Sequence, residues 1–305
     1  MSIKVEQIIT YPLKSGKGIT HSYGEVTVHE TGLEYDRMCM LVHAEGDEKG
    51  KFISQREKGC SGLSQVKTEV VADREGIFFE FSLPNGINFK ERWPNAGANI
   101  DPVSVWKSQC HGIDAGEEAA YYFSEYLDRP VRLMFYPDRA PRAVDPTYGQ
   151  EGDTTSFADG YPALITSSSS FLSLREHFQD GAGVSHQDFR PNIILSGTAP
   201  FEEDVMHHIR IGQVEFEIVK PCARCVMTTI NQETGETGRK EPLQTLTLLR
   251  RGKGEGIQGV FFGQNAIPRG LGIFSDRIKV GDEVEILSTR PVHAALKGVG
   301  LGFRP

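Results

Sequence analysis

The sequence has few of the features that mark secreted, membrane-spanning or nucleic-acid-binding proteins. Only five of its 305 residues are cysteine, an odd number that does not suit a disulfide framework and favours a reducing cytoplasm. The N-terminal residues lack the apolar segment of a signal peptide, and no apolar run approaches the roughly 18 residues that span a bilayer. The formal net charge of -8 argues against a general nucleic-acid surface. We therefore expect a cytoplasmic globular protein with neither a nucleic-acid nor a membrane partner.

The cysteines also lack the spacing of an iron–sulfur cluster of the ferredoxin type, which needs four cysteines at characteristic intervals. Cys222 and Cys225 form the single Cys-x-x-Cys pair, whereas Cys39, Cys60 and Cys110 are isolated. No cysteine follows Cys225 in the sequence. A redox enzyme with this sequence is therefore expected to receive its electrons from another protein.

Short strands, turns and a few helices predict the fold class. Up to about residue 115, short alternating strands separated by turns favour an antiparallel sheet or barrel. Apolar residues then recur at helical spacing over residues 117–127, and strands are expected over residues 131–136 and 163–166. The polar, proline-containing segment 137–159 is expected to be an irregular loop. The sequence therefore predicts a mixed, β-rich α+β fold with a few helices.

The sequence divides into three predicted parts. Residues 1–115 are expected to form an N-terminal β-barrel-like domain, which packs on a second β-barrel domain at residues 116–288. Residues 289–305 are expected to be a C-terminal tail. Helices of the second domain are predicted at residues 171–178, after serines that suit an N-cap, and at residues 243–249.

The Cys-x-x-Cys pair lies on a loop that the sequence places between two strands. Residues 211–218 alternate apolar and polar side chains, and the β-branched run 226–230 is expected to be the second strand. Pro221 lacks an N–H and is expected to interrupt the ladder. Lys220 and Arg224 flank the cysteines, and nearby cations favour a thiolate. A thiolate is either a nucleophile or a soft metal ligand.

Three other interpretations of this pair stay open at the level of the sequence. A structural zinc site needs four ligands, and the nearest histidine pair is His207 and His208. A thioredoxin-like dithiol normally opens a helix, whereas β-branched residues follow this pair. The third interpretation is two buried, structural cysteines.

Basic residues occur at several other turns and strand ends. Lys14 and Ser15 lie on a glycine-containing loop, where a backbone can approach a ligand and lysine can bind phosphate. Arg37 precedes a buried strand and is either an ion-pair partner of Asp36 or Glu34, or an anion clamp. Arg190 precedes another buried strand and needs an acid or a bound anion, because an unpaired buried arginine is costly.

Several short motifs resemble those of one family, in the same order along nearly the whole chain. They lie at residues 11–15 (YPLKS), 32–37 (GLEYDR), 189–193 (FRPNI), 203–204 (ED), 222–229 (CARCVMTT) and 237–243 (TGRKEPL). On these motifs the sequence resembles the MOSC proteins that carry a MOSC N-terminal β-barrel domain. That group includes bacterial YcbX-like enzymes and the mitochondrial amidoxime-reducing component.

The resemblance implies a molybdenum cofactor, Mo-molybdopterin. In the family, the cysteine directly before the apolar-Thr-Thr run binds molybdenum, so the implied catalytic and metal-binding residue is Cys225 and not Cys222. The positions that match cofactor-binding residues of the family are Lys14, Ser15, Arg37, Asp159, Arg190, Asn192, Ala223 and Arg224.

The resemblance also implies an activity and its partners. The family reaction is the two-electron reduction of small N-hydroxylated compounds, namely hydroxylamines, amidoximes and N-hydroxylated base analogues. YcbX-like proteins often carry a C-terminal ferredoxin-type domain, and the cysteines for one are missing after Cys225. A separate flavoprotein or iron–sulfur protein is therefore the expected electron donor. The alternative is a non-catalytic carrier of the molybdenum cofactor or a sulfur-handling module.

Overall fold

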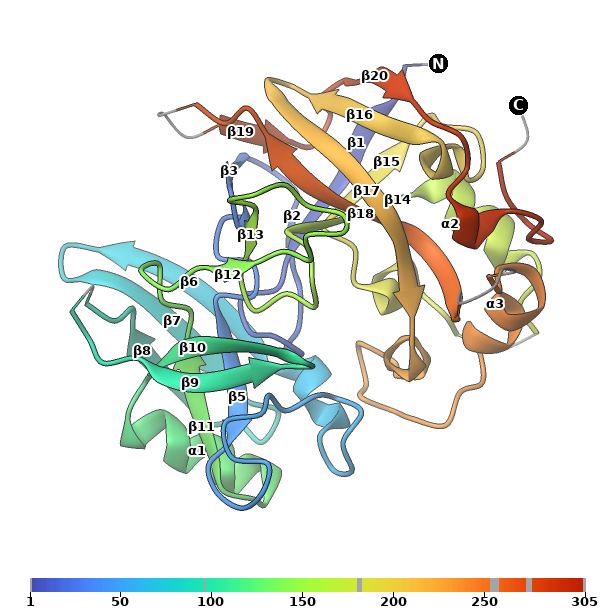
Figure 1. Cartoon of the computed structure of the whole chain (residues 1–305). Coiled ribbons are helices and arrows are strands. Elements are labelled where there is room, and N and C mark those ends of the chain that lie inside the picture. Colours follow the sequence, from blue (N-terminus) through green and yellow to red (C-terminus); the bar gives the residue numbers. More distant parts are fainter. Residues whose placement is uncertain (1, 96, 180–182, 253–257, 273–275, 304–305) are drawn as a thin grey trace.

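The computed structural model describes residues 2–95, 97–179, 183–252, 258–272 and 276–303, and its largest element is an eight-stranded sheet (Figure 1). In spatial order its strands are β2 (Ile19–His21), β1 (Lys4–Thr10), β15 (Ile193–Ser196), β14 (Ala163–Ser167), β18 (Val260–Arg269), β17 (Val214–Arg224), β16 (Met206–Ile211) and β20 (Val284–Thr289). β14 and β15 run parallel, and the other neighbours in the sheet are antiparallel. Side chains that alternate in burial account for these strands. In β17, for example, Val214, Phe216 and Ile218 are buried while the residues between them are half-buried.

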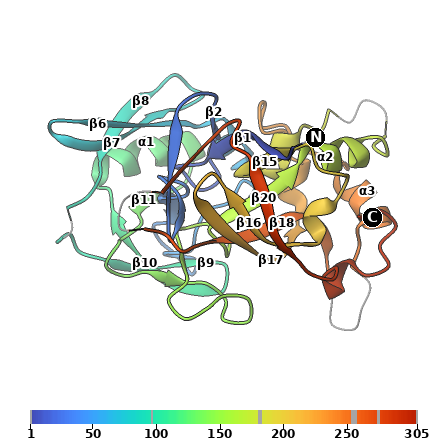
Figure 2. The same cartoon turned by 90° about the horizontal axis from the view of Figure 1, so that it is seen from above.

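A second group of strands lies beside this sheet and has its own apolar core (Figure 2). Four strands pair in the order β5 (Cys39–His43), β11 (Val131–Phe135), β10 (Ser108–Asp114) and β9 (Asp101–Val105), and three form the meander β6 (Lys67–Asp73), β7 (Gly76–Ser82) and β8 (Asn88–Arg92). Phenylalanine rings join the meander to the other elements. Phe79 contacts Phe135 of β11, and Phe81 contacts Phe123 of α1 (Glu117–Leu127).

Strand pairing crosses the predicted boundary between residues 115 and 116. β1 and β2 precede that boundary but belong to the large sheet, whereas α1 and β11 follow it but pack with the second group of strands. Two small sheets make further connections: β19 (Asp276–Lys279), β3 (Glu25–His29) and β4 (Gly32–Leu33) form one, and β12 (Arg142–Ala143) and β13 (Thr154–Thr155) form the other. The division into domains stays a prediction, and the two groups of strands interleave across it.

Two short helices, α2 (Ser168–Arg175) and α3 (Leu243–Leu249), share an apolar cluster with Phe262 of the large sheet. α2 begins before the predicted residue 171 because the Ser167 hydroxyl accepts a hydrogen bond from the Ser170 N–H and caps it there. Single turns of 3-10 helix occur at η1 (Ser61–Gln65), η2 (His186–Phe189), η3 (Glu202–Asp204), η4 (Val226–Thr229) and η5 (Ala294–Leu296). The predicted fold class, a β-rich α+β structure with a few helices, is confirmed.

Within the described ranges, no helix combines the length and the apolar composition that crossing a bilayer requires.

Candidate functional site

One pocket contains every residue that the family resemblance singles out. It is lined by Lys14, Ser15, Arg37, Asp159, Arg190, Asn192, Ala223, Arg224 and Cys225, together with Tyr161, Met227 and Asn265 among others. These residues follow β1, precede β5, β14 and β15, and end β17, so they are far apart in the sequence. The fold thus brings the predicted set together, while the role of each residue stays a prediction.

The cysteine loop differs from its predicted local structure in two ways. β17 continues through Pro221, because its register against β18 shifts between Ile218 and Lys220 and again between Pro221 and Ala223. Such bulges accommodate a residue that cannot donate to the ladder.

The strand predicted at residues 226–230 is wrong, since η4 occupies this position. The hydroxyl of Thr228 donates to the carbonyl oxygen of Cys225 at 3.0 Å, and that of Thr229 donates to Val226 at 2.8 Å. These local side-chain bonds compete with strand pairing and favour a turn. Cys225 therefore lies at the start of a turn that faces the pocket and solvent.

The five cysteines are free and differ in exposure. Cys225 is exposed and Cys222 is half-buried, whereas Cys39, Cys60 and Cys110 are buried. Burial raises the thiol pKa of those three, which keeps them protonated and unreactive. The pocket thus holds the accessible thiols of the described chain.

Two of the open interpretations of the pair lack structural support. Among the described residues, neither thiol belongs to a group of three His, Cys, Asp or Glu ligand atoms close enough to hold a metal. A zinc site at the pair would therefore be short of ligands. The thioredoxin-like interpretation needs a helix after the pair, and η4 is a single 3-10 turn.

The pocket carries an excess of positive charge. Lys14, Arg37, Arg190 and Arg224 line it, and Asp159 is the one acid among its described lining residues. Arg37 forms an ion pair with Asp36, to which its Nη1 donates at 2.7 Å. Because Arg37 also lines the pocket, the structure is compatible both with the ion pair alone and with the anion clamp that the sequence left open. Arg190 and Arg224 have no acidic partner among the described residues. An anionic ligand would compensate their charge.

Arg190 is buried but incompletely hydrogen-bonded. Its Nη1 donates to the Gly16 carbonyl at 2.8 Å and to Gln232 Oε1 at 2.9 Å. Its Nη2 is buried without a hydrogen-bond partner in the described chain, as is the Nε of Arg224. Burial lowers the pKa of Arg190 to about 10, so the side chain stays charged at neutral pH. Unsatisfied buried donors at a pocket indicate a missing acceptor.

Tyr11 supports two of these cations. The guanidinium carbons of Arg37 and Arg190 lie 4.2 and 4.1 Å from the centroid of its ring. Both arginines have left-handed backbone angles, with φ of 51° and 52°, and so does Ser15, with φ of 70°. Such angles cost roughly 1–3 kcal/mol each and are typical of functional sites. Nothing in the sequence indicated the role of Tyr11 beyond its presence in the 11–15 motif.

Lys14 and Asp159 form an ion pair at the edge of the pocket. Lys14 Nζ lies 2.5 Å from Asp159 Oδ1, and the same oxygen accepts a hydrogen bond from Trp106 Nε1 at 3.1 Å. Partial desolvation beside the pocket wall raises the pKa of Asp159, but the charge and hydrogen bond of Lys14 outweigh this effect and hold that pKa well below its usual range. The lysine stem is buried while two-thirds of the aspartate side chain is accessible, so the carboxylate can also face a ligand.

Arg142 holds the loop that carries Asp159. Its guanidinium donates to the carbonyl oxygens of Ser156, at 3.0 Å, and of Asp159, at 3.1 Å. Sequence reasoning missed this residue, because it lies in a segment without regular periodicity. Asn192 lines the pocket as the sequence predicts, and its role stays a prediction. Its side chain bonds the backbone of Leu164 and Ile9 and so joins β14 to β1.

Two family models match the chain one after the other. The MOSC N-terminal beta barrel domain matches residues 2–130, which include α1, and the MOSC domain matches residues 152–285. The chain therefore belongs to the MOSC-domain proteins that carry this N-terminal barrel domain.

Its relatives include mitochondrial amidoxime-reducing components. Component 1 of Homo sapiens is 29% identical over 298 residues, which cover 93% of this chain and 82% of that protein. Component 1 of Mus musculus is 30% identical over 254 residues, or 81% of this chain and 71% of that protein. The molybdenum cofactor sulfurase of Drosophila mojavensis is 30% identical over 253 residues, which cover 81% of this chain but 30% of the sulfurase.

Proposed function

We propose that this protein is a molybdenum-cofactor-dependent oxidoreductase that reduces small N-hydroxylated compounds such as hydroxylamines and amidoximes. The observation that carries the proposal is the joint placement of an exposed thiol, Cys225, and a buried guanidinium without an acidic partner, Arg190, in one pocket. The names of the relatives support the same chemistry.

The residues of the pocket fit this cofactor. The Cys225 sulfur is a soft anionic ligand for molybdenum. Nη2 of Arg190 and Nε of Arg224 would donate to the anionic pterin phosphate, and the Ser15 loop would approach it by backbone. When bound, the cofactor supplies the two-electron chemistry that removes oxygen from an N–OH group. Hydrogen bonds from Arg190 to Gly16 and Gln232, and from Arg224 to Phe189, hold these donors in place before the ligand arrives.

The test is elemental analysis and turnover of protein made in cells that synthesise the cofactor. We expect close to one molybdenum per chain and reduction of benzamidoxime or hydroxylamine with a reduced viologen dye as donor. Protein that is well folded but free of molybdenum, or that contains zinc at the cysteines, would contradict the proposal.

The sulfurase relative favours a second candidate function, a carrier or sulfur-handling module. In that case the protein would contain molybdenum and pterin but would not turn over any N-hydroxylated substrate.

The proposal of a reductase also includes a separate electron-donor protein and a cytoplasmic location. The location rests on the cysteine usage of the sequence alone.

A further inference from the structure

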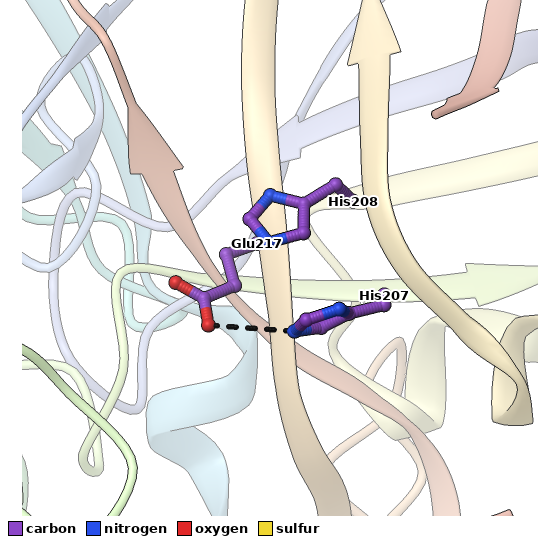
Figure 3. A group of neighbouring side chains, drawn as sticks. All are labelled: His207, His208 and Glu217. Carbon is purple, nitrogen blue, oxygen red and sulfur yellow. Dashed lines mark ion pairs between the residues drawn. The ribbon is translucent and has the colours of Figure 1, made fainter. Parts of the chain in front are cut away.

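His207, His208 and Glu217 converge on the large sheet (Figure 3), and none of them lines the pocket described above. The two histidines lie in β16 and the glutamate in the neighbouring strand β17. One ligand atom from each residue lies within 4.8 Å of the others, and His207 Nε2 is 3.7 Å from Glu217 Oε1. Within the described ranges, this is the one group of three such residues that comes this close.

An irregularity in β16 explains why two consecutive histidines share a face. In a regular strand, neighbouring side chains point to opposite faces. Here the register against β20 shifts between Met206 and His208 and again between His208 and Ile209. Met206 and Ile209 are buried, and both histidines between them are half-exposed. The bulge therefore re-aims His207 to the side of His208.

Strand pairing supplies the third group. Glu217 is the direct partner of His208 in the antiparallel pair of β16 and β17, so its side chain is on the same face. Figure 3 shows its carboxylate turned toward the ring of His207.

Arg269 orients the carboxylate of Glu217 through the oxygen that is not paired with His207. Nε of Arg269 donates a hydrogen bond to Glu217 Oε2 at 2.8 Å, and Nη2 lies 2.7 Å from the same oxygen in an ion pair. Arg269 is in turn held by Asp153, to which Nη2 donates at 2.9 Å. Oε2 is thus occupied, and Oε1 is directed to the histidines. Carboxylates that ligate metals are commonly held in this way by outer hydrogen bonds.

We propose that His207, His208 and Glu217 form a binding site for a divalent transition-metal ion of the Zn²⁺ type. Two imidazoles and one carboxylate form a common zinc ligand set, with water in the remaining position. The site shares no residue with the pocket that contains Cys225, and it does not depend on the proposed function. It would connect β16 and β17 through their side chains as well as their backbones.

Two cations lie near the proposed ion. The charge of Arg269 is offset by Glu217 and Asp153, with which it forms ion pairs. Arg290 acts electrostatically on His207, and its Nε and Nη2 are buried without hydrogen-bond partners among the described residues. Removing this charge should strengthen metal binding, because repulsion between a divalent ion and a guanidinium disappears. We expect Arg290→Gln to tighten Zn²⁺ binding roughly twofold to tenfold.

The direct experiment is calorimetric titration of the full-length protein with ZnCl₂. The wild type is expected to bind one ion at this site, and His208→Gln to bind it at least tenfold more weakly. His29→Gln is the matched control, because His29 also faces a carboxylate, that of Glu34 at 4.0 Å, without a third ligand. It should bind like the wild type.

X-ray absorption at the zinc edge separates this site from the cysteines. Nitrogen and oxygen ligands at about 2.0–2.2 Å are expected, whereas thiolate binding gives sulfur at about 2.3 Å. Sulfur ligation in the wild type, or unchanged affinity in His208→Gln, would overturn the proposal. Circular dichroism shows whether His208→Gln is folded. If it is not, the Zn²⁺ affinities of His207→Gln, expected to be weaker, and of Arg290→Gln, expected to be tighter, test the proposal in its place.

Discussion

The guanidinium of Arg224 donates a hydrogen bond to the sulfur of Cys222, with 2.9 Å between Nη1 and Sγ. The adjacent thiol of Cys225 has no such partner among the residues that the structure describes, and it is exposed at the start of η4. The two cysteines of one short motif therefore have different surroundings. Cys222 is held by the protein, and Cys225 is left accessible to a ligand.

The first prediction follows from this difference. Cys225→Ala should reduce reductase turnover at least a hundredfold and lower the molybdenum content. Cys222 also lines the pocket but is half-buried and hydrogen-bonded to Arg224, so it should not replace the exposed thiol of Cys225. Cys222→Ala should keep more than a tenth of the wild-type rate. Molybdenum analysis and viologen-driven turnover provide the measurements, and equal losses in both variants would contradict the assignment.

The second prediction concerns Arg190. Arg190→Met keeps the long apolar stem but removes the donors that lack a partner. Loss of one charge-assisted hydrogen bond costs about 1.5–3 kcal/mol, so cofactor occupancy should fall by roughly one to two orders of magnitude at limiting cofactor. Pterin fluorescence after release from the protein measures this. The control is Arg175→Met, because Arg175 is exposed on α2 and does not line the pocket, so the wild-type occupancy should be kept.

Much of the fold was predictable because local pattern and burial agree. The helix at 117–127 and the strands near 131 and 163 show clean periodicity, and they form where expected. The turn after Cys225 was not predictable from β-branched residues, since the hydroxyls of Thr228 and Thr229 bond locally instead. The pairing of β1 with β15 was also not predictable, because a contact between residues so far apart in the sequence produces no local periodicity.

Some residues of the candidate site were predictable from the sequence, and others were not. Motifs identified Lys14, Arg37 and Cys225, because each lies in a short run of distinctive residues. Tyr11 and Trp106 were not identified, since a single aromatic side chain in a sequence is most often part of a core. Only the three-dimensional contacts show that one supports two arginines and the other bonds Asp159.

The third prediction concerns Trp106 at the tip of the β9–β10 hairpin. Its φ of 56° is left-handed, its ring stacks on the Arg56 guanidinium at 4.1 Å, and its N–H bonds Asp159. Trp106→Gly should be more stable than Trp106→Ala by about 1 kcal/mol, because glycine tolerates this angle. Urea unfolding measures the difference. Both variants should raise KM for the substrate several-fold. An unchanged KM would show that Trp106 does not contribute to the substrate site.

The fourth prediction is a pH dependence set by Glu203. Burial, and then the charge of Asp204, raise the pKa of Glu203 to about 7 from an ordinary value of 4.5. The folded state therefore keeps this proton at pH values where the unfolded state has lost it. Stability from this group is complete below about pH 4.5 and is lost as the pH rises through about 7.

Glu203→Gln removes the titration and keeps an oxygen for the hydroxyls of Ser167 and Ser170. Between pH 4.5 and 7 its unfolding free energy should fall less than that of the wild type, by on the order of 3 kcal/mol. Denaturant titrations at several pH values give the comparison. Parallel curves for the two proteins would show that Glu203 does not titrate in this range.

The fifth prediction concerns electrons. A Gly-x-Gly-x-x-Gly string occurs at residues 254–259, but strand β18 follows it, whereas a dinucleotide loop opens a helix. NADH or NADPH alone should therefore not support turnover, and a reduced viologen or a flavin or iron–sulfur reductase should restore it. A protein donor steered by exposed cations such as Arg56 should be slowed by salt more than the dye. NADH-driven turnover by the purified chain would refute this.

The interleaved strands also set an order of events during synthesis. β1 leaves the ribosome early but finds its partner β15 only after residue 196 has been made, and the pocket is lined by residues from Lys14 to Asn265. A nascent chain that lacks β17 and β18 has no cysteine loop and no closed pocket. Any ligand that contacts the whole set of pocket residues must therefore be loaded after β18 has been synthesised.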